Sequence, residues 1–378
     1  MDESEHATEE SSNPHHWFSH LLDRFDEFHA RFEGPNTIGN NRTFWAVFWG
    51  IFAILLVYPM IVNTFVLKTN TSFFIWVILA LSLSIVWGYS GIFNFGQMAT
   101  FGLGGYAYGV VAINLTEMIG GTVLALLIGV VLPAVVMAAL GYFMFYGQVS
   151  GLYVAIITLV VTLMFNLLLT RTSGTTIGDA QLGGLNGMSG IPTLELDVVA
   201  FSFDLTPVSE YYLVLALMIA VYLGLRYTVN SYYGYVMIAI REDERRTQMF
   251  GYDIRKLKTA LFSAGAALGG LAGVLYVSWS GFIDPTMFGL VSASLPIIWV
   301  TVGGRGTLLG SGIAAYLLQY TSNELGAMGT GYSFIFLGIL FILVILFFPS
   351  GIVPALRDRW VAWSTTRKQS GSVQEGNS

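Results

Sequence analysis

Residues 227–258 read YTVNSYYGYVMIAIREDERRTQMFGYDIRKLK and carry the densest charge between the first and the last hydrophobic stretch of the chain. Long, nearly uncharged segments flank this stretch on both sides. Apolar segments of about 18 or more residues are typical of membrane-spanning helices. We therefore predict that residues 227–258 form a loop in water, between two membrane helices, that a partner can contact.

The composition of the whole chain supports a membrane fold. Of its 378 residues, 54% are hydrophobic and 11% are charged, whereas soluble domains average about 25% charged residues. We expect an all-α polytopic membrane protein with about ten transmembrane helices. They are predicted at residues 44–66, 72–88, 92–114, 121–145, 151–170, 211–226, 259–278, 288–303, 307–325 and 332–348.

The placement of Lys and Arg predicts the orientation. With the N-terminus in the cytoplasm and ten alternating spans, only Lys68 and Arg171 fall outside, and the other fifteen of the 17 Lys and Arg residues fall inside. Positively charged loops favour the cytoplasmic side. We therefore predict a multi-pass protein of the cell membrane with a cytoplasmic N-terminus.

Four regions follow from this arrangement. The acidic N-terminal tail contains apolar residues at helical spacing over 15–32, which predicts an amphipathic helix lying on membrane lipid. The long outside segment is rich in Gly, Pro, Thr and Asp, so we expect mostly loop with a short hairpin. The regions are a cytoplasmic tail at 1–43, a membrane domain at 44–348 with an outside loop at 171–210 and a cytoplasmic loop at 227–258, and a cytoplasmic tail at 349–378.

Several kinds of chemistry find no support in the sequence. The chain has no cysteine, and its five histidines all lie within the first 29 residues. His16 and His20 have metal-ligand spacing, but the polar face of a surface helix explains them better, so no metal site, cofactor or nucleic acid is expected. Residues 102–107 match a dinucleotide-binding pattern in letters only, and no phosphate-binding G-x-x-x-x-G-K-[ST] motif occurs. We predict that the protein is not an enzyme and that a separate subunit hydrolyses any ATP that drives it.

Glycines recur one helical turn apart in two predicted spans. Gly105 and Gly109 lie in the third span, and Gly265, Gly269 and Gly273 lie in the seventh. Such spacing lets helix backbones approach closely. We favour close helix packing, and the alternative is a moving interface or a wall of a pathway.

Two glycine-rich stretches predict interrupted helices, at residues 88–97 and 303–307. Unwound backbone at membrane depth is tolerated where it is buried in protein or lines a cavity, and transporter sites often use such breaks. We place a translocation pathway at Asn94, Gln97, Gly303 and Gly304. The alternatives are ordinary loops, with the two amides serving to satisfy the broken backbone.

The short stretches SGIFNFG at 90–96 and SGFIDP at 280–285 are faintly alike. The predicted topology puts them on opposite faces of the membrane, as in an inverted repeat. Ionisable side chains are rare within the spans, which argues against a proton-driven carrier and favours a neutral or zwitterionic cargo.

The charged loop, together with the sequences around it, resembles one family. The loop contains SYYGYVMIAIREDE at 231–244 and GYDI at 251–254. It leads into KTALFS at 258–263, ALGGLAGVLY at 267–276 and VGGRGTLLG at 302–310. Over residues 75–350 the chain resembles the inner-membrane permeases of ATP-binding cassette importers for branched-chain amino acids and urea. Within that family it is similar to the longer permease of a pair.

The resemblance implies an importer-permease fold built from an inverted repeat. It also implies a second permease subunit, two ATP-binding cassette ATPases and an extracellular solute-binding protein as partners. In the family a short coupling helix docks on the ATPase, and here Ile240–Gly251 corresponds to it, with Glu244 as its acidic anchor. Arg245 and Arg246 stand where many relatives have small residues. The coupling residues are expected to be Ile240, Arg241, Glu242, Asp243, Glu244, Arg245, Arg246 and Gly251.

The cargo is the finer question. Residues 298–310 and 341–351 look most like the urea branch of the family, so urea is favoured, with branched-chain amino acids as the alternative and short amides as a third option. A stand-alone channel or secondary carrier is the competing class of function. The charged loop separates the two classes, because a channel does not need it.

Overall fold

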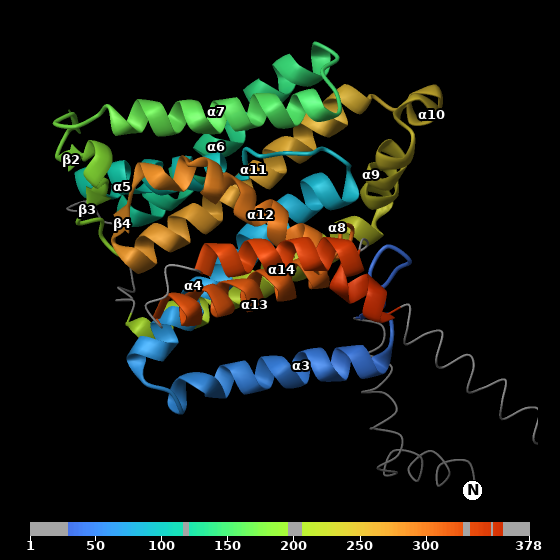
Figure 1. The fold of residues 1–378 in the computed structure, drawn as a ribbon, viewed down its shortest axis with the longest axis horizontal. Coiled ribbons are helices and arrows are strands. Elements are labelled where there is room, and N and C mark those ends of the chain that lie inside the picture. The colour runs from blue at the N-terminus through green and yellow to red at the C-terminus, as the bar shows by residue number, and fades with distance from the viewer. Residues whose placement is uncertain (1–28, 116–120, 196–205, 328–332, 349–350, 358–378) are drawn as a thin grey trace, which may run out of the picture.

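The computed structural model describes residues 29–115, 121–195, 206–327, 333–348 and 351–357. Most of the predicted amphipathic helix at 15–32 and most of the C-terminal tail lie outside the described residues. Helices dominate the fold (Figure 1). The helices are α3 Arg42–Val57, η2 Tyr58–Met60, α4 Thr64–Leu83, η3 Ser84–Tyr89, α5 Gln97–Asn114, α6 Gly121–Tyr146, α7 Leu152–Thr170, η4 Gly184–Asn186, α8 Pro207–Asn230, α9 Tyr232–Glu242, α10 Glu244–Met249, α11 Ile254–Ser280, η5 Pro285–Phe288, α12 Leu290–Gly303, α13 Leu308–Ala327 and α14 Ser333–Phe347.

Four strands of two residues each complete the described structure. Strands β1 Thr176–Ile177 and β2 Ala180–Gln181 form an antiparallel hairpin, which confirms the hairpin predicted within 171–210. Strands β3 Met188–Ser189 and β4 Phe282–Ile283 pair antiparallel, with Met188 opposite Ile283. The second pair joins residues 188–189 of the predicted outside loop to the segment that follows α11.

Among the described residues, six helical segments are long and apolar enough to cross a membrane: α3 with η2, α4 with η3, α6, α7, α8 and α11. Helix α12 is apolar but shorter. A helix lies within each of the ten predicted segments, so the chain is a polytopic helical membrane protein. The number of ten spans stays a prediction, because length and composition support six within the part of the chain that the structure describes.

Helix α4 forms the centre of the bundle, and α3 lies at its edge. The most apolar stretch of α4 and η3 is completely buried, and these helices pack against α8, α11, α12 and α13. In α3, by contrast, only 6% of the most apolar stretch is buried. In Figure 1, α3 runs along one side of the molecule with its long axis beside α4 and α13. An apolar helix with little protein cover requires a lipid environment, because its exposed side chains would otherwise contact water.

Glycines allow α11 to pack closely on its neighbours. A Cβ atom added to Gly273 would overlap the carbonyl oxygen of Phe101 in α5, and one added to Gly269 would overlap Thr100. A Cβ added to Gly105 would overlap the side chains of Ile283 and Val277. These contacts favour the close-packing interpretation of the glycine motifs.

The two remaining glycines of the motifs lie in similar surroundings. A Cβ at Gly265 would overlap Val86 in η3, and one at Gly109 would lie 2.8 Å from the sulfur of Met188. Three further glycines outside the G-x-x-x-G steps meet where α5, α6 and α11 cross, and each faces a backbone atom of another: Gly104, Gly129 and Gly270. The chain therefore uses glycine at both sides of these helix contacts.

The two ends of the bundle carry different elements. Helices α9 and α10 lie at one end, and β3 and β4 lie at the other (Figure 1). The stretch at 90–96 lies beside α9, since Gly91 faces Arg241, whereas the stretch at 280–285 contains β4. The two similar stretches thus lie at opposite ends of the molecule, as an inverted repeat requires.

Candidate functional site

Helix α9 carries one buried face and one exposed face. Val236 and Ile240 pack with Ile254 at the start of α11, and Ile240 is 1% exposed. Tyr232, Tyr233 and Tyr235 lie on the exposed face. Ile240 was predicted to be a coupling residue; its side chain packs α9 against the start of α11, and its role in coupling stays a prediction.

Asp243 ends α9 and begins α10. Its backbone is extended, with φ −156° and ψ 102°, and its Oδ1 accepts a hydrogen bond from the backbone N–H of Arg246 at 3.1 Å. Its other oxygen, Oδ2, lies 3.1 Å from Nε of Arg246. Aspartate is a favoured N-cap, because it satisfies a free N–H of the first helical turn. The single helix predicted over Ile240–Gly251 is therefore wrong in detail: two helices meet at Asp243.

Gly251 ends the second helix. Its φ is +89°, a conformation that side-chain-bearing residues rarely adopt, and its N–H donates to the carbonyl of Gln248 at 3.0 Å. Asp253 then caps α11 by accepting from the N–H of Lys256 at 3.2 Å. This hydrogen bond, together with the ion pair to the Lys256 ammonium, lowers the pKa of Asp253.

Glu244 forms an ion pair within the chain. Its Oε1 contacts Nζ of Lys258, whose side chain is 8% exposed, while the Glu244 side chain is 48% exposed. A nearly buried ammonium needs a carboxylate or several acceptors beside it. The contact therefore fixes α10 against α11, and it uses one oxygen of the group predicted to anchor an external partner.

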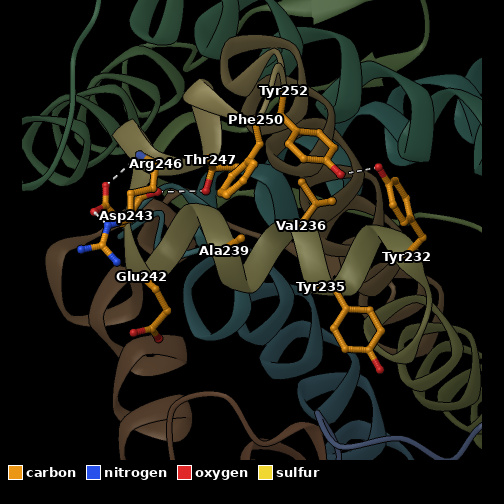
Figure 2. A pocket seen from close by; sticks show the side chains of 10 residues that line it. All are labelled: Tyr232, Tyr235, Val236, Ala239, Glu242, Asp243, Arg246, Thr247, Phe250 and Tyr252. Atoms are coloured by element: carbon orange, nitrogen blue, oxygen red, sulfur yellow. Dashed lines mark hydrogen bonds and ion pairs between the residues drawn. The ribbon is translucent and has the colours of Figure 1, made fainter.

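A groove opens between α9 and the chain that follows it (Figure 2). It encloses about 380 Å³. Tyr232 and Tyr252 are hydrogen-bonded across one end of it, which raises the pKa of Tyr232, and Asp243 and Arg246 are paired at the other. It is lined by Tyr232, Tyr235, Val236, Ala239, Glu242, Asp243, Arg246, Thr247, Phe250 and Tyr252.

The tip of this segment exposes large apolar side chains in a polar setting. Met249 is 85% exposed and Phe250 is 82% exposed, and Arg245 and Arg246 on α10 are exposed beside them. Exposed apolar side chains next to charges on a protein surface are typical of a protein–protein contact. We call α9, α10 and Phe250 the α9–α10 surface.

The predicted interruption at 88–97 is present. Helix α4 continues into the π-helix η3 and ends at Tyr89, and regular structure resumes at Gln97. Backbone groups between them have partners within the protein: the N–H of Ile92 donates to Val86 O at 3.1 Å, and that of Phe95 donates to Oγ1 of Thr158 in α7 at 3.1 Å. The break is therefore buried in protein and held by hydrogen bonds.

Asn94 and Gln97 complete this network. Asn94 lies in the irregular segment before α5, so the two residues do not lie on one helix. Asn94 Nδ2 donates to Gln97 Oε1 at 3.1 Å, and Asn94 Oδ1 accepts from the N–H of Gly96 at 2.7 Å. Gln97 Nε2 donates to Ser82 Oγ at 2.6 Å and to Gly265 O at 2.9 Å. Both side chains are at most 2% exposed. Gln97 thus ties α4, α5 and α11 together, which favours the structural alternative over the pathway prediction.

Replacing Gln97 with leucine is expected to destabilise the protein by about 3 kcal/mol, because Asn94, Ser82 and the carbonyl of Gly265 would each lose a buried partner. Thermal unfolding in detergent measures this. Gln181→Leu, at an exposed glutamine of β2, is the matched control and should leave the unfolding temperature nearly unchanged. A Gln97→Leu protein that unfolds like wild type but no longer transports would restore the pathway interpretation.

The second predicted interruption is a connection between two helices. Helix α12 ends at Gly303 and α13 begins at Leu308. Gly304 adopts φ +110°, and a Cβ at Gly303 would overlap the carbonyl of Gly310. These contacts favour a tight loop, and a role for Gly303 and Gly304 in a pathway stays a prediction.

Sequence reasoning missed one charged residue of structural importance. Arg226 was counted among the cytoplasmic positive charges, but its side chain is fully buried. Its guanidinium donates to the carbonyls of Phe32, Ile38 and Gly39 at 2.9, 3.1 and 2.7 Å. A charge directly at the end of an apolar span is the one signal that could have suggested this role.

Comparison with known proteins identifies the family. Residues 65–345 match the family described as branched-chain amino acid transport system / permease component. The chain is 27% identical over 332 residues to the "High-affinity branched-chain amino acid transport system permease protein LivM" of Escherichia coli (strain K12), covering 82% of this chain and 75% of that protein. It is 28% identical over 327 residues to the "Probable branched-chain amino acid transport permease protein LivM" of Methanocaldococcus jannaschii, covering 75% of this chain and 91% of that protein. No solved structure matches. Because the family match covers most of the chain, the protein belongs to the family of permease components of branched-chain amino acid transport systems.

Proposed function

We propose that this chain is one permease subunit of an ATP-binding cassette importer that carries branched-chain amino acids across the cell membrane. The observation that carries the proposal is the α9–α10 surface, which joins two apolar helices, α8 and α11, and exposes Met249 and Phe250. Two short helices held rigidly against a membrane domain suit the transfer of movement from a soluble subunit. A channel would not require them.

The energy source is proposed to be a separate ATPase. The sequence contains no G-x-x-x-x-G-K-[ST] motif, which is the backbone cradle that holds ATP phosphates in such enzymes. In the assembly that the family resemblance implies, two ATPases, a second permease subunit and an extracellular binding protein complete the importer. The ATPase would contact the α9–α10 surface on the cytoplasmic side, where the N-terminus is also proposed to lie.

The proposed cargo is a branched-chain amino acid. Both relatives are named for branched-chain amino acid transport, and these names favour the alternative over the urea prediction drawn from residues 298–310 and 341–351. Urea is retained as the second candidate because of those two stretches. Either solute is neutral or zwitterionic, which agrees with the scarcity of ionisable side chains in the spans.

The test combines two substitutions at the exposed tip, Met249→Ser and Phe250→Ser. Removing two apolar anchors of a protein–protein contact is expected to cost about 2 kcal/mol each, so the ATPase should no longer co-purify with the permease. Uptake of labelled leucine should fall to background. The fold should survive, because both side chains are more than four-fifths exposed.

Leu185→Ser is the matched control. Leu185 is 76% exposed in η4, within the predicted outside loop, so its replacement should leave both co-purification and uptake unchanged. Normal ATPase binding and leucine uptake by the double variant would contradict the proposed role of the surface. Labelled urea, measured in the same cells, decides between the two cargoes.

A further inference from the structure

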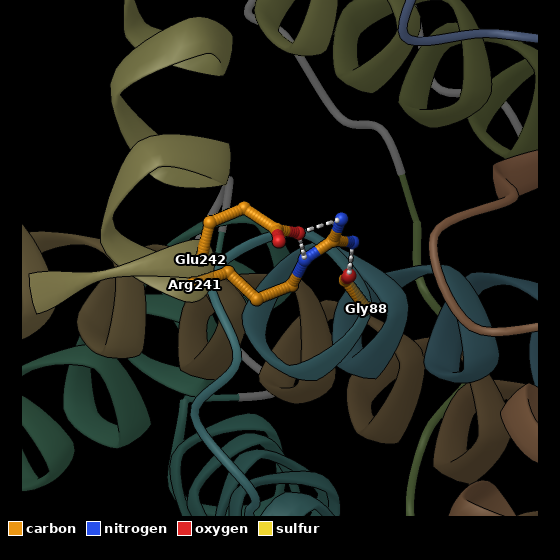
Figure 3. Close-up of polar contacts among 3 residues, drawn as sticks. All are labelled: Gly88, Arg241 and Glu242. Carbon is orange, nitrogen blue, oxygen red and sulfur yellow. Dashed lines mark hydrogen bonds and ion pairs between the residues drawn. The ribbon is translucent and has the colours of Figure 1, made fainter.

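Arg241 connects the α9–α10 surface to the interrupted helix (Figure 3). It lies near the end of α9, and its Nη1 donates a hydrogen bond to the carbonyl oxygen of Gly88 at 2.8 Å. Gly88 belongs to η3, one residue before the helix ends at Tyr89. The side chain is 32% exposed, so the contact is only partly open to solvent.

The carbonyl of Gly88 needs such a donor. The last carbonyls of a helix have no N–H partner within the helix, and they carry the negative end of its dipole, which a cation stabilises. A guanidinium–carbonyl hydrogen bond is stronger than one between neutral groups. Arg241 therefore caps η3 from a different part of the chain, 153 positions away in sequence.

Glu242 fixes the direction of the guanidinium. Its Oε1 accepts from Arg241 Nη2 at 2.9 Å and from Nε at 3.3 Å. With one edge of the planar group held by the neighbouring carboxylate, Nη1 is left to contact Gly88. The orientation of the guanidinium is thus set within α9, so a movement of α9 moves the hydrogen-bond donor relative to the carbonyl of Gly88.

The second helix interruption lies at the same place. Gly306, with φ +81°, would bring a Cβ within 3.2 Å of Arg241 Nη1, and a Cβ at Gly88 would lie 2.9 Å from the backbone nitrogen of Gly306. A Cβ added to Gly91, whose φ is +75°, would lie 3.0 Å from Cγ of Arg241. The backbone of three segments therefore meets around one arginine, and glycine leaves the room for it.

Arg305 also contacts this junction. Its guanidinium lies 4.6 Å from the ring of Trp87, the residue before Gly88. Burial, and then the nearby positive charge of Arg241, lower the pKa of Arg305. The contact between the Arg305 guanidinium and the Trp87 ring holds the loop at 304–307 against η3.

We propose that Arg241 is a positioning residue that transmits movement of the α9–α10 surface to η3 and the irregular segment after it, residues 84–96, and to the helix connection at 303–307. This inference rests on the proposed function, since only a partner bound to that surface would move it. Beyond Gly88 the chain leads directly into the Asn94–Gln97 network and helix α5. A shift of α9 would change the cap of η3 and so the backbone that precedes this network.

The test uses the complete importer in liposomes, with the permease as wild type, Arg241→Gln, Arg241→Lys and the control Arg255→Gln. Arg255 is an exposed arginine at the start of α11 that lies outside the proposed junction. In Arg241→Gln, leucine uptake per ATP hydrolysed is expected to fall about tenfold, because one charge-assisted hydrogen bond is lost. The ATPase should still bind. Arg241→Lys should recover part of the leucine uptake per ATP hydrolysed, and Arg255→Gln should match wild type in this quantity.

Hydrogen exchange separates transmission from a purely static cap. With and without a non-hydrolysable ATP analogue, wild type should change exchange both in 244–250 and in 84–96, whereas Arg241→Gln should change it only in 244–250. Equal responses in 84–96 for both proteins, or an unchanged uptake ratio, would overturn the inference while leaving the proposed function intact. No response at 244–250 in wild type would instead overturn the proposed function.

Discussion

Gly273→Ala is expected to lower the free energy of unfolding by about 3 kcal/mol, since overpacking at a helix contact costs that much when neither side can give way. A Cβ at this position would overlap the carbonyl oxygen of Phe101, and the backbone nitrogen of Gly105 lies only 3.1 Å away. Both atoms belong to the backbone of α5, so no side-chain rotation relieves the overlap. Thermal unfolding in detergent, monitored by size-exclusion chromatography, measures the loss.

Gly224→Ala provides the matched control. Gly224 lies inside α8 with no atom within 4 Å of an added Cβ, so alanine there should be neutral or stabilising by up to about 1 kcal/mol. The two substitutions have the same chemistry and differ in the space available. Equal unfolding temperatures for both variants would contradict the close contact between α5 and α11.

Arg226→Met is expected to be comparably damaging, at about 3–5 kcal/mol, the cost of breaking a buried charged contact. The substitution removes the donors to three carbonyls in segment 32–39. It also removes the cation–π contacts with Phe44 and Trp45, at 4.8 and 4.7 Å. We expect loss of folded protein in detergent and increased protease cleavage near residues 32–40.

Lysine should not rescue this site, because an ammonium cannot reproduce the planar fork that reaches several carbonyls at once. Arg255→Met, at an exposed arginine, should unfold like wild type. If Arg226→Lys proved as stable as wild type, the charge and not the fork geometry would be the important property.

The helices were predictable because apolar length is a strong signal in membrane proteins. Each predicted span contains a helix, and the break at 88–97 follows from its glycines. The division at Asp243 was missed because α10 has only six residues, ERRTQM. A helix this short has no apolar residues repeated at helical spacing that would reveal it in the sequence. Its N-cap aspartate was the available signal.

The site residues were harder to predict because their partners are distant in sequence. Asn94 and Gln97 suggest a polar passage when only their own segment is considered, and the contact between Gln97 and Gly265 spans 168 positions. Likewise, nothing local to Glu244 indicates that Lys258 is nearly buried beside it. Polar residues within apolar spans therefore mark important positions, but tertiary contacts decide whether they serve stability or transport.

Uptake of labelled leucine into liposomes that contain this chain, alone or with its partner subunits and with ATP on the ATPase side, tests the central claim most directly. The importer interpretation predicts no uptake by the chain alone, and ATP-dependent uptake by the complete assembly that the Met249→Ser, Phe250→Ser variant abolishes. Rapid uptake by the chain alone, independent of ATP, would contradict this account and would indicate a channel.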